Sequence, residues 1–345
     1  MKTIRQSLLL LCMLAGTAPA GCAAPAGEKD LVYVGHNQAP DHPTNIALLA
    51  FEEYIESRLG DRYDVEVYPS ELLGSQTDMV QLTQTGAVDV CVASNSILET
   101  FSENYTLFNM PYLFASSRAY HAAMDDQAVT EPIFSSTTEA GFRAVAWMDA
   151  GTRNFYTVSA PIESPSDLKG LKIRVQQSPT NVQMMRLLGG SATPMGFGEV
   201  YTALQSGVID GAENNEIALT SNGHGDVCKF YSYDMHQMIP DILVANNRFL
   251  DGLSPEDKKV FEEGFRLVNE VQRREWSKAV HEAKERAETV QQVRFLYPDV
   301  RPFQEICTPM HQDFLSAHQQ LRPVYEKIQE YNARYPSSEE LEDVQ

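Results

Sequence analysis

The chain has 345 residues, and 43% of them are hydrophobic, which is enough for a packed core in one large or two ordinary domains. Its 47 acidic residues outnumber its 27 lysines and arginines, so the formal net charge is −20. This charge excludes nucleic acid and anionic lipid as expected partners, because both require a basic surface. Any anion must therefore be bound by specific arginines that act against the overall field.

The N-terminal 27 residues have the features of an export signal. Lys2 and Arg5 precede an apolar run over 8–14 that is too short to span a membrane, and Ala18-Pro19-Ala20 is a candidate cleavage site. Cys22 is an alternative site of lipid attachment, although a lipoprotein signal normally carries an aliphatic residue where this chain has proline. We expect an exported protein, either periplasmic or anchored outside the cytoplasm as a lipoprotein.

The cysteines indicate neither a disulfide framework nor a metal site. Cys12 and Cys22 belong to the signal region, while Cys91, Cys228 and Cys307 are widely spaced, odd in number and free of any C-x-x-C pattern. We expect Cys91 to pack as a small hydrophobic residue.

The first elements of the mature chain predict an α/β fold. Residues 31–35 are typical of a buried strand, 45–59 have the period of an amphipathic helix, and 63–68 alternate as a second strand. This order favours a largely parallel sheet. Ligands of such sheets bind at the carboxyl ends of strands, so we expect polar residues of the following loops, Asn37 among them, to face a ligand.

A weak internal repeat predicts two similar lobes. Residues 74–86 are expected to form a helix between two glycines that leads into a strand at 87–92, and 198–207 lead in the same way into 208–210. Polar residues follow both strands, namely Ser94 and Asn95 after the first and Glu213, Asn214 and Asn215 after the second. We expect these side chains to meet in a cleft between the lobes.

Two helices are predicted near the C-terminus. Ser254 is a suitable N-cap before Pro255, and apolar residues keep helical spacing from there to about 290, or about nine turns. A second helix is expected over 309–331, and an acidic tail over 333–345.

The segment 151–215 contains the most informative residue, Arg174. It lies in a predicted short strand, 171–175, between Ile173 and Val175. A buried guanidinium is costly unless an anion meets it, so either a ligand or an internal carboxylate must be its partner. The spacing equally allows an arginine on the polar face of the strand.

Three motifs of this segment, DLKGLKIRV, PMGFGEVYTALQSG and DGAEN, resemble the signature of the substrate-binding subunits of TRAP (tripartite ATP-independent periplasmic) transporters. The likeness continues through LLGSQTDM, the run Met110-Pro111-Tyr112-Leu113-Phe114 and the long helix, and so covers nearly all of the mature chain. It implies an α/β, two-lobed periplasmic-binding-protein fold with a long lobe-spanning helix that bends as the lobes close.

The resemblance also suggests how the chain is divided. We expect a signal peptide over 1–27 and a lobe-spanning helix over about 255–290. The expected first lobe comprises 28–150 and about 239–255, and the expected second lobe comprises 151–238 and about 285–332.

The resemblance implies a ligand site for an organic acid. Arg174 matches the arginine that binds the substrate carboxylate in a bidentate pair, and Arg153 and Asn214 match residues that contact the same group. Phe197 matches an aromatic wall of the cleft. Further polar residues fall where other members place ligand-facing side chains: Gln76, Gln177, Ser94 and Asn37.

The ligand class is narrowed by differences from the sialic-acid branch, which has a carboxylate at the position of Ser94. The pair Asn214-Asn215 and the stretch around His236 are more similar to members that bind uronates or related sugar acids, with C4-dicarboxylates as the alternative. On base rates, His224 and His236 are more often structural than ligand-binding.

No catalytic motif is present in the sequence. There is no G-x-S-x-G, phosphate loop or H-E-x-x-H, and Gly196-Phe197-Gly198 lacks the third glycine of a dinucleotide fingerprint. We expect a monomeric receptor without cofactor that delivers its ligand to TRAP membrane permease subunits. The alternatives from other classes are an extracytoplasmic ligand sensor on the same fold and a secreted carbohydrate-acid enzyme.

Overall fold

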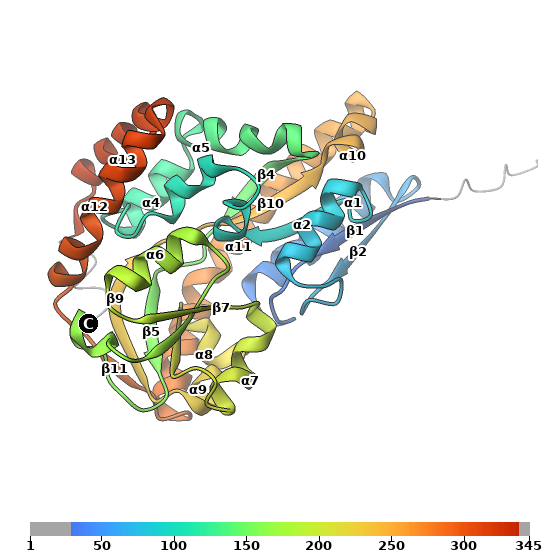
Figure 1. The fold of residues 1–345 in the computed structure, drawn as a ribbon. Coiled ribbons are helices and arrows are strands. Elements are labelled where there is room, and N and C mark those ends of the chain that lie inside the picture. Colours follow the sequence, from blue (N-terminus) through green and yellow to red (C-terminus); the bar gives the residue numbers. More distant parts are fainter. Residues whose placement is uncertain (1–28, 338–345) are drawn as a thin grey trace, which may run out of the picture.

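The computed structural model describes residues 29–337, and the described chain is built on two β-sheets covered by helices (Figure 1). The predicted signal peptide, Cys22 and the end of the acidic tail lie outside these residues. The predicted α/β class is confirmed. Among the described helices, none is long and apolar enough to cross a membrane.

The first sheet has the strand order β2-β1-β3-β10-β4. β1 pairs in parallel with β2 and β3, while β10 pairs antiparallel with β3 and β4. We call the part of the molecule around this sheet the first lobe. Its strands are β1 (Asp30–Gly35), β2 (Tyr63–Tyr68), β3 (Val90–Ser94), β4 (Phe142–Met148) and β10 (Asp241–Asn246).

The second sheet has the order β11-β9-β5-β8-β6-β7, and we call the part around it the second lobe. β5 is antiparallel to both of its neighbours, β8 and β9. Its strands are β5 (Arg153–Thr157), β6 (Lys172–Val175), β7 (Ser191–Pro194), β8 (Gly211–Asn214), β9 (Phe230–Gln237) and β11 (Arg294–Leu296).

Both sheets are mixed, so the prediction of a largely parallel sheet is right only in part. β1 is parallel to β2 and β3, β6 is parallel to β7 and β8, and β11 is parallel to β9, whereas β5 and β10 are antiparallel to their neighbours. The chain passes between the sheets along two short connections, from β4 to β5 over 149–152 and from β9 to β10 over 238–240. The strands that follow these two connections, β5 and β10, are the ones that run antiparallel to their neighbours. The exact lobe boundaries stay a prediction.

Helices cover both sheets, and the C-terminal helix α13 lies beside α4 and α5 (Figure 1). The α-helices are α1 (Pro43–Leu59), α2 (Gln76–Thr85), α3 (Asn95–Leu98), α4 (Ser117–Met124), α5 (Gln127–Phe134), α6 (Pro179–Leu187), α7 (Val200–Gln205), α8 (Ile217–Ser221), α9 (His224–Val227), α10 (Asn247–Gly252), α11 (Pro255–Thr289), α12 (Arg301–Ala317) and α13 (Arg322–Arg334). The 3₁₀ helices are η1 (Glu103–Asn109), η2 (Ser135–Ala140), η3 (Pro165–Leu168), η4 (Phe197–Glu199) and η5 (Gln319–Leu321).

The internal repeat is confirmed as helix, glycine and strand in both lobes, although each strand begins three residues later than predicted. Gly86 and Gly207 both adopt left-handed backbone, with φ of 80° and 72°. The next two amides then bond back to the helix, to Leu82 O in the first lobe and to Ala203 O in the second. These bonds satisfy free carbonyls at the helix end, so the strand starts only after them.

Helix α11 begins at the predicted N-cap, where Ser254 Oγ accepts a hydrogen bond from Asp257 N at 3.1 Å. Its first half packs Phe261 and Phe265 against Phe51 of α1 in the core of the first lobe. Farther along, Trp276 packs beside Ile217, and Ala287 enters the core of the second lobe. One helix therefore supports both lobes.

The prediction of a single helix over 309–331 is wrong. The chain leaves helical geometry at His318, where φ is −120° and ψ is 61°, and α13 restarts with Pro323 in its first turn. A proline tolerates the first turn but disrupts a helix interior, since it has no N–H and its ring clashes with the preceding turn. Pro309, in contrast, is accommodated inside α12.

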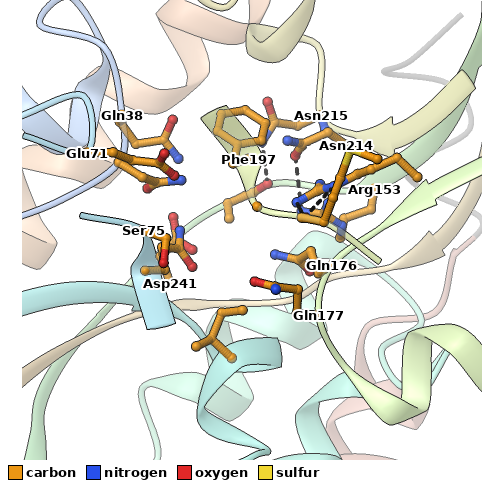
Figure 2. A pocket seen from close by; sticks show the side chains of 17 residues that line it. Gln38, Glu71, Ser75, Arg153, Gln176, Gln177, Phe197, Asn214, Asn215 and Asp241 are labelled. Carbon is orange, nitrogen blue, oxygen red and sulfur yellow. Dashed lines mark hydrogen bonds between the residues drawn. The ribbon is translucent and has the colours of Figure 1, made fainter. Parts of the chain in front are cut away.

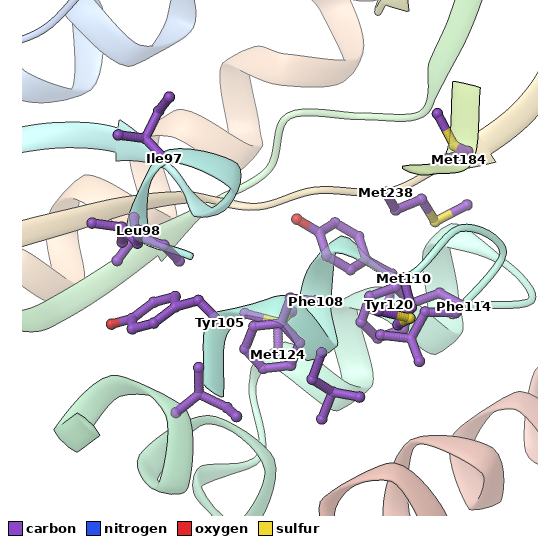
Figure 3. Close-up of a cluster of buried hydrophobic side chains, with 14 of the residues drawn as sticks. Ile97, Leu98, Tyr105, Phe108, Met110, Phe114, Tyr120, Met124, Met184 and Met238 are labelled. Atoms are coloured by element: carbon purple, nitrogen blue, oxygen red, sulfur yellow. The ribbon is translucent and has the colours of Figure 1, made fainter. Parts of the chain in front are cut away.

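The largest core cluster joins the two lobes. It includes Met184 of α6, Met238 of the β9–β10 connection and Met110, and extends to Phe303 and Ile328 of the C-terminal helices. Figure 3 shows part of this cluster, where the side chains of Met238, Met110, Tyr120 and Phe114 gather beside one another. The lobes are thus held by packing as well as by the connecting strands.

Replacing Phe261 by alanine is expected to lower the free energy of unfolding by about 3–5 kcal/mol, because its buried ring contacts Phe51, Tyr63 and Phe249. Urea unfolding followed by circular dichroism measures this loss. Glu262→Ala, at the next and exposed position of α11, is the control and should change the value by less than about 0.5 kcal/mol. Equal effects of the two variants would contradict the assigned packing.

Candidate functional site

A pocket between the lobes collects side chains from both sheets (Figure 2). All the predicted site residues except Ser94 line it. The second lobe contributes Arg153, Arg174, Gln176, Gln177, Met195, Gly196, Phe197, Asn214 and Asn215, and the β4–β5 connection contributes Ala150. The first lobe contributes Asn37, Gln38, Glu71, Ser75, Gln76, Ile97 and Asp241.

The strand pairing explains why distant residues meet here. β5, β8 and β6 are neighbours in the second sheet, and the antiparallel pair places Asn154 opposite Asn214. The start of β5, with Arg153, therefore lies beside the end of β8. Since β6 is parallel to β8, its Arg174 approaches the same edge.

Arg153 is buried, and each nitrogen of its guanidinium donates a hydrogen bond to the protein. Its Nε donates to Glu213 Oε2, one terminal nitrogen donates to Glu213 O at 2.8 Å, and the other donates to Asn214 Oδ1 at 3.1 Å. The fork of the guanidinium is thereby oriented, and Asn214 Oδ1 is tied to it. Glu213 itself is completely buried.

A second cation helps to balance Glu213. His236 Nδ1 lies 2.8 Å from Asp234 Oδ2, and its Nε2 lies 3.6 Å from Glu213 Oε2. Burial alone would raise the pKa of Glu213, but the charges of Arg153 and His236 outweigh it and hold the pKa at about 2. Burial likewise opposes the charged form of His236, yet Asp234 and Glu213 raise its pKa to about 9.

Arg174 is buried to the same degree but has no acidic partner. Its Nε and one terminal nitrogen donate to Met195 O at 3.2 and 2.9 Å, and its guanidinium carbon lies 5.7 Å from the centre of the Phe197 ring. Within residues 29–337, no carboxylate oxygen lies within the 4.0 Å of an ion pair with it. Burial lowers the pKa of Arg174; the charge of Glu213 opposes this shift, and repulsion from Arg153 adds to it. The internal carboxylate considered from the sequence exists for Arg153 and not for Arg174.

Ser94 lies behind the pocket wall and orients two residues that line it. Its Oγ accepts from Gln176 Nε2 at 2.8 Å, and its backbone N–H donates to Gln76 Oε1 at 2.9 Å. The Ser94 hydroxyl is thus hydrogen-bonded to a residue of the second lobe, and it does not line the cavity.

Asn215, which was expected in the cleft, lines the pocket, whereas several other lining residues were missed from the sequence: Gln38, Glu71, Ser75, Gln176 and Asp241. Gln176 carried a usable signal, because it stands two positions after Arg174 and strand alternation places both on one face. Glu71 and Asp241 carried none, since they are brought in by the loop after β2 and by the antiparallel β10. Burial, followed by repulsion from Asp149, raises the pKa of Asp241 to about 6, although Arg153 opposes the rise.

Neither His224 nor His236 lines the pocket. His224 Nδ1 lies 2.8 Å from Tyr156 OH, and burial lowers its pKa to about 3, so it is neutral. Both histidines have structural contacts, as was expected because histidines at such positions are more often structural than ligand-binding.

The raised pKa of His236 predicts how its contribution to stability depends on pH. A histidine whose pKa rises from 6.5 to about 9 on folding stabilises the protein fully below pH 6.5, and this contribution is lost as the pH rises through 9. The difference in unfolding free energy between the wild type and His236→Gln should therefore shrink by roughly 3 kcal/mol from pH 6 to pH 10.

Urea titrations at a series of pH values measure that difference. His281→Gln, on the exposed face of α11, is the matched control, and its difference from the wild type should stay flat. A flat difference for His236→Gln as well would show that His236 is not held in its charged form.

The comparisons with known proteins agree with this architecture. The model of the family "bacterial extracellular solute-binding protein, family 7" matches residues 34–317. The uncharacterized protein YiiZ of Salmonella typhimurium is 40% identical over 299 residues, which cover 87% of this chain and 90% of YiiZ.

Two solved TRAP periplasmic solute-binding proteins have the same fold. The protein of Anaerococcus prevotii, with bound D-glucuronate, has a TM-score of 0.88 and 63% identity, and the match covers 89% of this chain and all of that one. The protein of Xanthobacter autotrophicus, with bound β-D-galacturonate, has a TM-score of 0.83 and 31% identity, over 86% of this chain and 98% of that one. The resemblance drawn from the motifs is confirmed, and the chain belongs to the family 7 solute-binding proteins, the substrate-binding subunits of TRAP transporters.

Proposed function

We propose that this protein is an extracytoplasmic receptor that captures a sugar acid, a uronate, by its carboxylate as the lobes close, and delivers it to TRAP permease subunits. The single observation that carries the proposal is the buried guanidinium of Arg174, which opens onto the pocket with no acidic partner among the described residues. A desolvated cation of this kind is stabilised by an anion that the protein itself does not provide.

The geometry favours a carboxylate as that anion. The Arg174 guanidinium is a planar fork, and two oxygens of one carboxylate match two of its N–H groups better than a single acceptor does. Arg153 and Asn214 stand beside it on neighbouring strands, already oriented by Glu213. In a pocket that excludes water, this attraction is stronger than at an open surface.

Lobe closure is supported by hydrogen bonds that run between the lobes. Gln176 of the second lobe donates to Ser94 of the first, and Glu99 accepts from Ser178 and Thr180, each at 2.6 Å. We infer that opening breaks these bonds, while the two strand connections and α11 bend.

A uronate fits the remaining chemistry of the pocket. Its wall carries the amide groups of Gln38, Gln76, Gln177 and Asn215, which suit a polyhydroxylated ligand because each offers both donors and an acceptor. The relatives from Anaerococcus and Xanthobacter were solved with glucuronate and galacturonate. The family is one of transport receptors, so capture and delivery, rather than catalysis, is the proposed role.

Replacing Arg174 by alanine is expected to abolish binding of the acid. For the wild type, D-glucuronate at about a hundred times its dissociation constant should add roughly 2.7 kcal/mol to the unfolding free energy. Thermal unfolding with a panel of uronates, aldonates, C4-dicarboxylates and sialic acid measures this as a shift in melting temperature, and Arg174→Ala should show no shift.

Arg186→Ala is the matched control, because Arg186 is an exposed arginine on α6 of the same lobe. It should respond to the ligand as the wild type does. The proposal would be overturned if no acid shifted the melting temperature of the wild type, or if the Arg174→Ala variant shifted as much as the wild type. If only C4-dicarboxylates shifted it, they would be the ligand class in place of uronates.

A further inference from the structure

Two carboxylates line a pocket that is proposed to bind an anion. Glu71 comes from the loop after β2, and Asp241 is the first residue of β10. In a protein of net charge −20, acidic groups inside an anion site are unfavourable unless the ligand brings donors to them. Their presence therefore restricts what the far end of the ligand can be.

The two oxygens of Glu71 have different surroundings. On one side the carboxylate lies against Gly198 in η4 of the second lobe, and the backbone N–H of Gly198 favours its charged form. The approach is close, since a methyl group added at Gly198 would lie 2.4 Å from Glu71 Oε2. The other oxygen, Oε1, is buried without a hydrogen-bond partner among the described residues. One oxygen thus reaches across the pocket and the other is free to accept.

The backbone holds Glu71 in this place. Ser70 and Glu71 both have left-handed backbone, with φ of 56° and 59°, which residues other than glycine seldom adopt. The loop is secured by two amide bonds, from Ser70 N to Gln38 O at 3.0 Å and from Glu71 N to His36 O at 3.1 Å. Uncommon backbone of this kind gathers at ligand sites, where the surrounding structure imposes it.

Figure 2 shows where this end of the pocket lies. Glu71 and Gln38 are on one side, while Arg153 and Asn214 are on the opposite side. Burial raises the pKa of Glu71, and the Gly198 N–H and the charge of Arg174 oppose part of this rise, although Arg174 and Glu71 are farther apart than an ion pair. A ligand whose carboxylate meets the arginines therefore directs its other end toward Glu71.

We propose that Glu71 is a specificity-determining residue that accepts a hydrogen bond from a ligand hydroxyl through Oε1 while its other oxygen engages Gly198 of the opposite lobe. This inference rests on the proposed function. It explains why the ligand would be an acid with hydroxyl groups and a single carboxylate. A sugar hydroxyl satisfies the unpartnered oxygen. A second ligand carboxylate has no proton to donate and adds a like charge beside Glu71 and Asp241, which costs binding energy.

The test compares D-glucuronate with D-glucarate, its six-carbon dicarboxylate counterpart, by isothermal titration calorimetry. The wild type should prefer glucuronate. Glu71→Gln keeps the size of the side chain and an acceptor but removes the charge, and should reduce the ratio of the two affinities by roughly tenfold or more. Taking this ratio between variants cancels the difference in shape of the two ligands.

Glu199→Gln is the matched control. Glu199 is exposed, carries the same charge one residue from Gly198 and does not line the pocket. Glutamine keeps its capping role toward Gly196 N, so the turn is preserved. The affinity ratio of this variant should stay within about twofold of the wild type if direct contact with Glu71, and not general charge, sets the preference.

A second variant moves Glu71 without changing it. Gly198 does not have positive φ, so Gly198→Ala keeps the backbone and places a methyl group against Oε2. We expect weaker glucuronate binding by roughly tenfold with an unchanged melting temperature of the unliganded protein. An unchanged affinity ratio in Glu71→Gln, together with unchanged affinity in Gly198→Ala, overturns the inference. If the Arg174→Ala variant bound glucuronate as the wild type does, the proposed function itself would be overturned.

Discussion

The desolvation of two arginines is the constraint on which the rest of the structure depends. Arg153 and Arg174 lie on the inner edge of the second sheet, both almost fully buried. Glu213, on the strand between them, forms an ion pair with Arg153 but not with Arg174, on which its charge acts only from a distance. The buried residues His236 and Asp234 then complete the charge balance around Glu213. Arg174 thus stands at the wall of the cavity without an ion-pair partner among the described residues.

Much of the fold could be predicted because it is determined locally. β2 has the predicted bounds, α11 begins at the predicted serine, and both glycines that end the repeated helices have left-handed backbone. The predictions failed for features that are determined by tertiary contacts. The strand directions depend on how the chain passes between the sheets, and the break at His318 depends on a proline five residues later.

The site divides in the same way. Arg174, Asn214 and Phe197 stand in motifs that resemble a known family, Arg153 matches a further position of that family, and the structure brings all four to one pocket. Ser94 ends a buried strand, so it was expected to face a ligand, but Gln176 from the other lobe occupies its hydroxyl. Glu71 lies in a loop without periodicity. No local pattern could have shown that it would reach a glycine 127 positions farther along the chain.

The path of the chain between the sheets also bears on how such receptors diversify. The first sheet takes β1 to β4 and then β10, and the second takes β5 to β9 and then β11, so neither half corresponds to one continuous stretch of a gene. A single recombination point between two related genes would therefore build at least one sheet from both parents. Point substitution within the pocket is the simpler path to a new ligand preference, because it leaves the paired strands of both sheets intact.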